Sequence, residues 1–196
     1  MQISIFNEIR RKRIKGYRNE PSRLREDAEN ESAIVDDYQG RAVLELLQNA
    51  DDAQFNPDSD SNSQRIGDNF VEFELGKKLL IVRNGGYPIS PDGVKSLSGT
   101  HISPKDKKVM IGNKGIGFKS VLEITNQPII HSSFHFRFSE KDTRKLLLEE
   151  DLLSILGKNG YCPILRLPFK LPFDQKRGGE GQWATEIKLP LKGARE

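Results

Sequence analysis

A helical pattern between Asp36 and Ala53 sets the strongest limit on how this chain can fold. At about 100° per residue, apolar side chains gather on one side of such a helix and polar side chains on the other. The apolar side is Val43, Leu46, Leu47, Ala50 and Ala53, and the polar side is Glu45, Asn49 and Asp52. The polar side is either a solvated surface or a functional face. As a functional face, it offers a general base, a neutral oxygen ligand for a hard cation and a further acceptor in one row.

Two glycine-bearing segments follow this helix, at residues 82–88 and 111–118. The second has glycines at Gly112, Gly115 and Gly117 and leads into an apolar segment that is typical of a helix. Glycines let backbone amides approach an anion closely, and the start of a helix adds N–H groups without partners. The segment therefore predicts a phosphate-binding loop.

With these two segments, the sequence resembles the GHKL ATPases, which share the Bergerat fold. The resemblance covers about residues 38–191 and is closest to the sacsin-type branch, which is similar to the ninety-kilodalton heat-shock chaperones. The matching motifs are Glu45 to Ala53 (the N box), Asn84-Gly85-Gly86 and Gly112 to Gly117 (the glycine boxes), and Thr185-Glu186-Ile187 (the closing threonine strand).

The expected fold is α+β, a two-layer sandwich in which helices cover one face of a mixed, mostly antiparallel sheet. Residues 1–35 are expected to form a charged arm or helix, and residues 36–196 the ATP-binding domain. The resemblance places an ATP lid at about 98–114.

Along the chain, a hairpin is expected from alternating residues 71–75 and a returning strand at 79–82. Ser90-Pro91-Asp92 predicts the start of a short helix through Leu97. A helix is expected at 117–124, and strands are expected at 134–138, 164–167 and 183–189. On the last strand Thr185, Ile187 and Leu189 share one face. The buried Thr185 hydroxyl then needs a partner, which is either adenine, a water or the backbone.

The resemblance also implies a role for each site residue. Glu45 would be the catalytic base, and Asn49 would hold Mg²⁺ and contact the nucleotide, with Asp52 nearby. Asn84 and Thr185 would contact adenine, although the family normally has aspartate where this chain has Asn84. An asparagine keeps one acceptor oxygen and adds a donor that the adenine amine cannot use. The remaining nucleotide contacts would come from Gly86, Gly112, Gly115, Ile116, Gly117 and Phe118.

The function implied is that of an ATP-binding domain, with slow Mg²⁺-dependent hydrolysis of ATP to ADP and phosphate, in a larger chaperone-like or remodelling protein. Its partners would be an adenine nucleotide, a second copy in an ATP-dependent homodimer, and a protein client. The alternative is a protein-interaction module, either gated by nucleotide or carrying a degenerate ATP site.

Composition limits other functions. A formal charge of +3 over 196 residues argues against nucleic acid as the main partner, although the basic cluster at 10–15 leaves a weaker, salt-dependent alternative. The single cysteine, Cys162, excludes an internal disulfide and fits a buried thiol in a reducing compartment. No apolar run is long enough to cross a membrane, so a cytoplasmic location is expected.

Overall fold

The structure is a computed structural model that describes residues 4–55, 64–99, 117–158, 160–172 and 183–193. Its helices are α1 (Ile5–Asn19), α2 (Ser22–Asp37), α3 (Ala42–Asp52), α4 (Pro91–Leu97) and α5 (Glu140–Glu149), with 3₁₀ turns η1 (Gly117–Glu123), η2 (Leu153–Leu156) and η3 (Ile164–Arg166). Its strands are β1 (Ile66–Leu75), β2 (Leu79–Gly86), β3 (Ile129–His131), β4 (His135–Arg137), β5 (Phe169–Lys170) and β6 (Thr185–Pro190).

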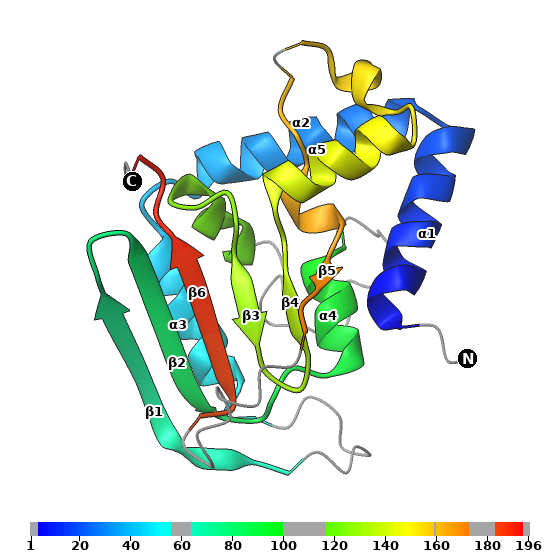
Figure 1. Ribbon diagram of the computed structural model, residues 1–196. Coiled ribbons are helices and arrows are strands. Elements are labelled where there is room, and N and C mark those ends of the chain that lie inside the picture. The colour runs from blue at the N-terminus through cyan, green and yellow to red at the C-terminus, as the bar shows by residue number, and fades with distance from the viewer. Residues whose placement is uncertain (1–3, 56–63, 100–116, 159, 173–182, 194–196) are drawn as a thin grey trace.

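The strands form one six-stranded sheet in the order β1-β2-β6-β3-β4-β5. Every pairing among the described strands is antiparallel, which agrees with the α+β class expected from the sequence. In Figure 1, α3 and α4 lie behind the sheet, while α2 and α5 lie across one end of it.

The two faces of the sheet differ in chemistry. One row of register partners, Val82, Ile187, Ile130 and Phe136, is buried in the main core together with Leu46 of α3. The neighbouring row carries Glu72, Arg83 and Glu186, in which the Arg83 guanidinium pairs with both carboxylates. Because side chains alternate across a strand, the apolar row faces the helices and the charged row faces away from them.

A single helix was expected from Asp36 to Ala53, but the structure has two helices that meet within this range. Helix α2 ends at Asp37 and α3 begins at Ala42, and Gly40 between them has a φ of +76°. A left-handed glycine of this kind is a common way to end a helix. The Gly40 N–H donates to the Glu123 carboxylate at the end of η1, which anchors the connection.

The buried side of α3 also differs from the expected one. Leu46 and Ala50 are buried as expected, but Val43 and Leu47 are 52% and 43% exposed, and Ala42 takes their place in the core. Ala42, Leu46 and Ala50 recur every four residues, so the helix packs through a narrow row of mainly small side chains. Small side chains let α3 approach the sheet and η1 closely.

Residues 164–167 were expected to be a strand, and this prediction is wrong. Ile164 to Arg166 form the 3₁₀ turn η3, because Glu31 of α2 accepts hydrogen bonds from the backbone N–H groups of Ile164 (2.5 Å) and Leu165 (3.1 Å). These two backbone N–H groups thus have a carboxylate as their hydrogen-bond acceptor, in place of the carbonyl groups of a neighbouring strand.

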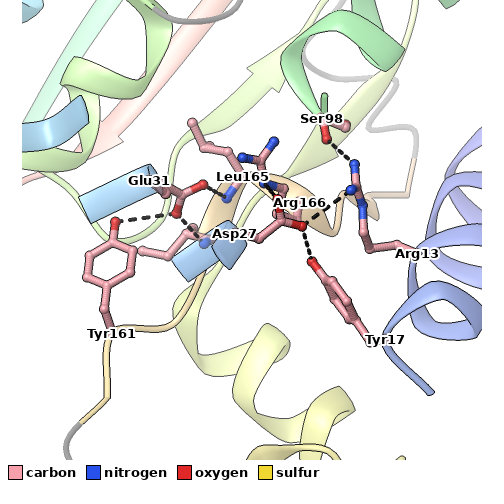
Figure 2. Close-up of polar contacts among 9 residues, drawn as sticks. Arg13, Tyr17, Asp27, Glu31, Ser98, Tyr161, Leu165 and Arg166 are labelled. Atoms are coloured by element: carbon pink, nitrogen blue, oxygen red, sulfur yellow. Dashed lines mark hydrogen bonds and ion pairs between the residues drawn. The ribbon is translucent and has the colours of Figure 1, made fainter. Parts of the chain in front are cut away.

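A buried cluster of charges surrounds this turn, as Figure 2 shows. Asp27 of α2 accepts a hydrogen bond from the Tyr17 hydroxyl (2.7 Å) and pairs with Arg13 (3.3 Å) and with the fully buried Arg166 (3.2 Å). Arg13 also donates to the carbonyl oxygen of Ser98 at 3.1 Å. The cluster therefore ties α1 and α2, which lie mostly within the segment expected as an arm, to η3 and to the end of α4.

The remaining elements largely follow the sequence predictions. Helix α4 begins at Pro91, with the Ser90 hydroxyl accepting from the Gly93 N–H. The segment from Gly117 is helical as expected, although it is a 3₁₀ turn. Cys162 is buried, and burial raises the pKa of its thiol to about 12. Within the described ranges, no helix combines the length and apolar character that a membrane span requires.

Candidate functional site

A cavity of about 280 Å³ lies between α3, α4 and the ends of β2 and β6. Its walls are mainly apolar, and its polar groups are few. Apolar lining residues include Leu46, Val82, Ile89, Leu97, Phe118 and Ile187, and polar ones include Asn49, Asp52, Asn84, Ser90, Ser96 and Thr185. A mainly apolar cavity with a few placed polar groups is the usual form of a small-molecule site.

Helix α3 contributes two of its three predicted site residues to this cavity. Asn49 is half-buried and Asp52 is exposed, and both line the cavity. Glu45, one turn earlier, is not among the lining residues. Its carboxylate instead lies against the backbone of Gly117, where a β-carbon would come within 1.8 Å of the Glu45 Oε2 atom. The polar row of α3 thus runs from the cavity to the start of η1.

A side chain at Gly117 would displace the Glu45 carboxylate from this position. Phe118 follows it and lines the cavity with a buried ring. The other predicted residues of this glycine segment, Gly112, Gly115 and Ile116, lie outside the described residues, as does most of the predicted lid.

Gly86 has a supporting position rather than a place in the cavity wall. Its φ is +108°, and a β-carbon on it would lie 2.3 Å from the carbonyl oxygen of Ala53. The next residue, Tyr87, donates its backbone N–H to that same oxygen at 2.6 Å. The glycine therefore lets the end of β2 come close to the end of α3, which brings Asn84 and Asn49 to one cavity.

Asn84 is buried and lines the cavity. Its side-chain nitrogen donates to the carbonyl oxygen of Gly85 at 2.8 Å. A carbonyl oxygen only accepts hydrogen bonds, so the atom of Asn84 that faces it has to be the nitrogen. One of the two N–H groups that distinguish asparagine from the usual aspartate is thereby held within the protein. The oxygen and the second N–H of the side chain are left for a ligand.

Thr185 lies opposite Asn84, because the two residues are register partners on β6 and β2. It is buried and lines the same cavity. Its hydroxyl lies next to the hydroxyl of Ser132, with the two oxygens 3.0 Å apart, and adenine or a water as a further partner stays a prediction. Sequence reasoning missed Ser132, which directly follows β3 and has no distinctive spacing to the glycine motifs.

Helix α4 and the residues before it were also missed as part of the site. Pro88, Ile89 and Ser90 line the cavity, followed by Asp92, Ser96 and Leu97. The Ser90-Pro91 helix start was the one sequence signal for this wall, because it fixes where the chain turns from β2 into α4.

The buried charge cluster borders the site through residues next to the cavity wall. Arg13 contacts Ser98, which directly follows Leu97, and Lys119 directly follows Phe118. Burial, with the nearby Arg166 charge, lowers the pKa of Lys119 to about 8, although Glu31 and Asp27 act in the opposite direction. Burial raises the pKa of Glu31, and its hydrogen bonds to the η3 backbone oppose that rise.

Comparison with known proteins gives one partial similarity. A stretch of 98 residues, 49% of this chain, is 36% identical to Protein NO VEIN of Arabidopsis thaliana. The matched stretch makes up 3% of that protein's length. No protein-family model matches the chain.

Proposed function

We propose that this chain is an adenine-nucleotide-binding domain of the Bergerat type that hydrolyses ATP slowly with Mg²⁺. The observation that carries the proposal is the pair Asn84 and Thr185, which lie opposite each other at a mainly apolar cavity. The apolar walls suit the faces of a purine ring, and the Asn84 oxygen suits its exocyclic amine. A buried acceptor strongly disfavours ligands that offer it no hydrogen-bond donor.

The residues of α3 fit the phosphate chemistry of such a nucleotide. Among the described residues, no three His, Cys, Asp or Glu side chains form a group that could hold a metal ion. Mg²⁺ normally keeps several waters and is bound through one or two protein ligands and the phosphates of its substrate. The half-buried Asn49 oxygen fits as that protein ligand. Bound Mg²⁺ would neutralise phosphate charge during transfer.

Glu45 is the residue that we assign as the base for hydrolysis. It lies one turn from Asn49 on the same helix, and its carboxylate contacts the backbone of Gly117, near the end of the predicted phosphate-binding loop. A carboxylate in this position can orient a water and accept its proton. Asp52, on the other side of Asn49, lines the exposed end of the cavity and contacts the nucleotide or its waters.

A chaperone-like or remodelling role in a larger protein is a further part of this proposal. It is supported by the motif resemblance. An ATP-dependent homodimer, a protein client and a cytoplasmic location are proposed on the motif resemblance alone.

A nucleotide-gated interaction module is the second candidate, and the outer surface of α3 favours it. Val43, Leu44 and Leu47 are 52%, 59% and 43% exposed on the helix that also carries Glu45 and Asn49. Adjacent exposed apolar side chains are typical of interaction surfaces. A partner bound there would contact the same helix as the nucleotide.

Two measurements on the same protein separate these candidates. Steady phosphate release from ATP that needs Mg²⁺ and is lost in Glu45→Gln supports the ATPase. Nucleotide binding without phosphate release, in a chain that still folds, supports the interaction module.

A further inference from the structure

Ser132 lies behind the cavity wall and joins three segments of the site. Its Oγ atom accepts a hydrogen bond from the backbone N–H of Ile89 at 2.9 Å. The same atom lies 2.8 Å from the carbonyl oxygen of Ala184 and 3.0 Å from the Thr185 hydroxyl. Ile89 and Thr185 both line the cavity, whereas Ser132 is not among the lining residues.

The direction of each hydrogen bond follows from these three neighbours. A serine hydroxyl has one proton to donate and two lone pairs that accept. The Ala184 carbonyl oxygen can only accept, so the Ser132 proton has to point to it. The two lone pairs then face the Ile89 N–H and the Thr185 hydroxyl. Thr185 is therefore the donor in its contact with Ser132.

These hydrogen bonds decide what Thr185 offers to a ligand in the cavity. Because the Thr185 proton is held by Ser132, the Thr185 oxygen presents only lone pairs to a ligand. The Asn84 side chain also offers its oxygen as an acceptor, while one of the two N–H groups of its nitrogen donates to Gly85. Two register partners on adjacent strands thus each offer an acceptor oxygen, and a ligand group that pairs with Thr185 has to be a donor.

We propose that Ser132 is a positioning residue that makes this site selective for 6-aminopurine nucleotides over 6-oxopurine nucleotides. The inference rests on the nucleotide-binding function proposed above. The 6-amino group of adenine carries two N–H donors, which match two acceptors. The 6-oxo group of hypoxanthine carries only lone pairs, so it has no proton to give to the Thr185 oxygen. Polar groups left unpaired in this way give large discrimination.

The test compares ATP with inosine triphosphate, which has the same outline but an oxygen at position 6. Affinities of both are measured by calorimetry for the wild-type chain and for Ser132→Ala. Without Ser132, the Thr185 hydroxyl can turn and donate to the 6-oxo group. The preference for ATP should then fall about fivefold to tenfold, the effect of one hydrogen bond of about 1–1.4 kcal/mol.

Three further variants separate this role from a merely structural one. Ser132→Thr keeps the hydroxyl and should keep the preference, and Ser133→Ala changes an exposed neighbour and should leave it unchanged. In a Thr185→Val background, Ser132→Ala should no longer affect the preference, because no hydroxyl is left to reorient. A general loosening of the wall through Ile89 would instead weaken both nucleotides alike.

The outcomes distinguish this inference from the function on which it rests. A folded wild-type chain that binds neither nucleotide overturns both. A wild-type chain that prefers ATP, with the same preference in Ser132→Ala, overturns the selectivity role of Ser132 alone.

Discussion

The side-chain nitrogen of Asn84 donates to the backbone carbonyl of Gly85 at 2.8 Å, and this contact fixes the orientation of the Asn84 amide. The Gln54 side chain donates to the same carbonyl at 3.1 Å, so the Gly85 oxygen accepts two bonds. Asparagine at this position is therefore compatible with reading an exocyclic amine. One of its two N–H groups stabilises the end of β2.

The first prediction concerns Asn84→Asp, which restores the residue that is usual in the resembling family. An ionised carboxylate has no proton for the Gly85 carbonyl and would place an acceptor against it in a buried position. We expect the variant to lose about 1–3 kcal/mol of unfolding free energy at pH 7. Urea denaturation measures this difference.

The pH dependence of that loss has a definite sign. Burial and the facing carbonyl raise the pKa of the introduced carboxyl in the folded state, so folding favours its protonated form. The variant is then closest to the wild type near pH 4 and falls behind as the pH rises. A gap that stays constant between pH 4 and pH 7 would contradict this account of the Asn84 contact.

The second prediction concerns Glu45→Gln. If Glu45 accepts a proton from water, the change should lower the rate of ATP hydrolysis at least about a hundredfold, while ATP affinity changes about threefold or less. Phosphate release at saturating ATP gives the first value and calorimetry gives the second. Gln48→Ala, an exposed change on the same helix, serves as the control. Equal turnover in Glu45→Gln and the wild type would exclude Glu45 as the base.

The third prediction concerns Glu31, whose carboxylate replaces a neighbouring strand for Ile164 and Leu165. Glu31→Gln turns one acceptor into a donor that faces a backbone N–H. We expect a loss of about 2–3 kcal/mol in unfolding free energy, because two buried donors then face each other. Glu29→Gln, at an exposed position on α2, should change stability by less than about 0.5 kcal/mol. Similar losses in both variants would show that the η3 contact is not the cause.

The fourth prediction concerns Lys119, whose pKa in the folded chain is about 8 against an ordinary value of 10.5. Between these two values the unfolded chain binds more protons, so this group makes the folded chain more stable as the pH rises. Lys119→Met removes the group. At pH 7 the unfolding free energy of Lys119→Met should exceed that of the wild type by at most about 3 kcal/mol, and this difference should shrink as the pH rises above 8.

The measurement is urea denaturation of both proteins between pH 7 and pH 9. Lys141→Met, at an exposed position on α5, should show no such change. A difference between the Lys119→Met and wild-type stabilities that is independent of pH would contradict the low pKa.

Several parts of the fold could be predicted because their signals are local. The Ser90 cap with Pro91 identified the start of α4, and alternation identified the strand that carries Thr185. The α+β class followed from the motif resemblance, and the antiparallel sheet of the structure agrees with it. Asn49, Asp52, Asn84, Phe118 and Thr185, predicted from their motifs, line one cavity.

The errors arose where contacts between distant residues decide the structure. Residues 164–167 were expected to be a strand from their apolar residues, but Glu31, more than 130 residues earlier, accepts hydrogen bonds from two of their amides. Val43 and Leu47 were assigned to the core by hydrophobicity, whereas α3 packs through its smaller residues. Ser132 could not be found from sequence, because its role depends on Ile89 and Thr185, which only the folded chain brings to it.

The most direct test of the central claim is a calorimetric titration of ATP and ADP, with and without Mg²⁺, on the wild-type chain and on Asn84→Ala. The account predicts saturable binding of ATP that Mg²⁺ strengthens and that Asn84→Ala abolishes while the chain remains folded. A folded wild-type chain that binds neither nucleotide, or an Asn84→Ala variant that binds ATP as tightly as the wild type, would contradict it.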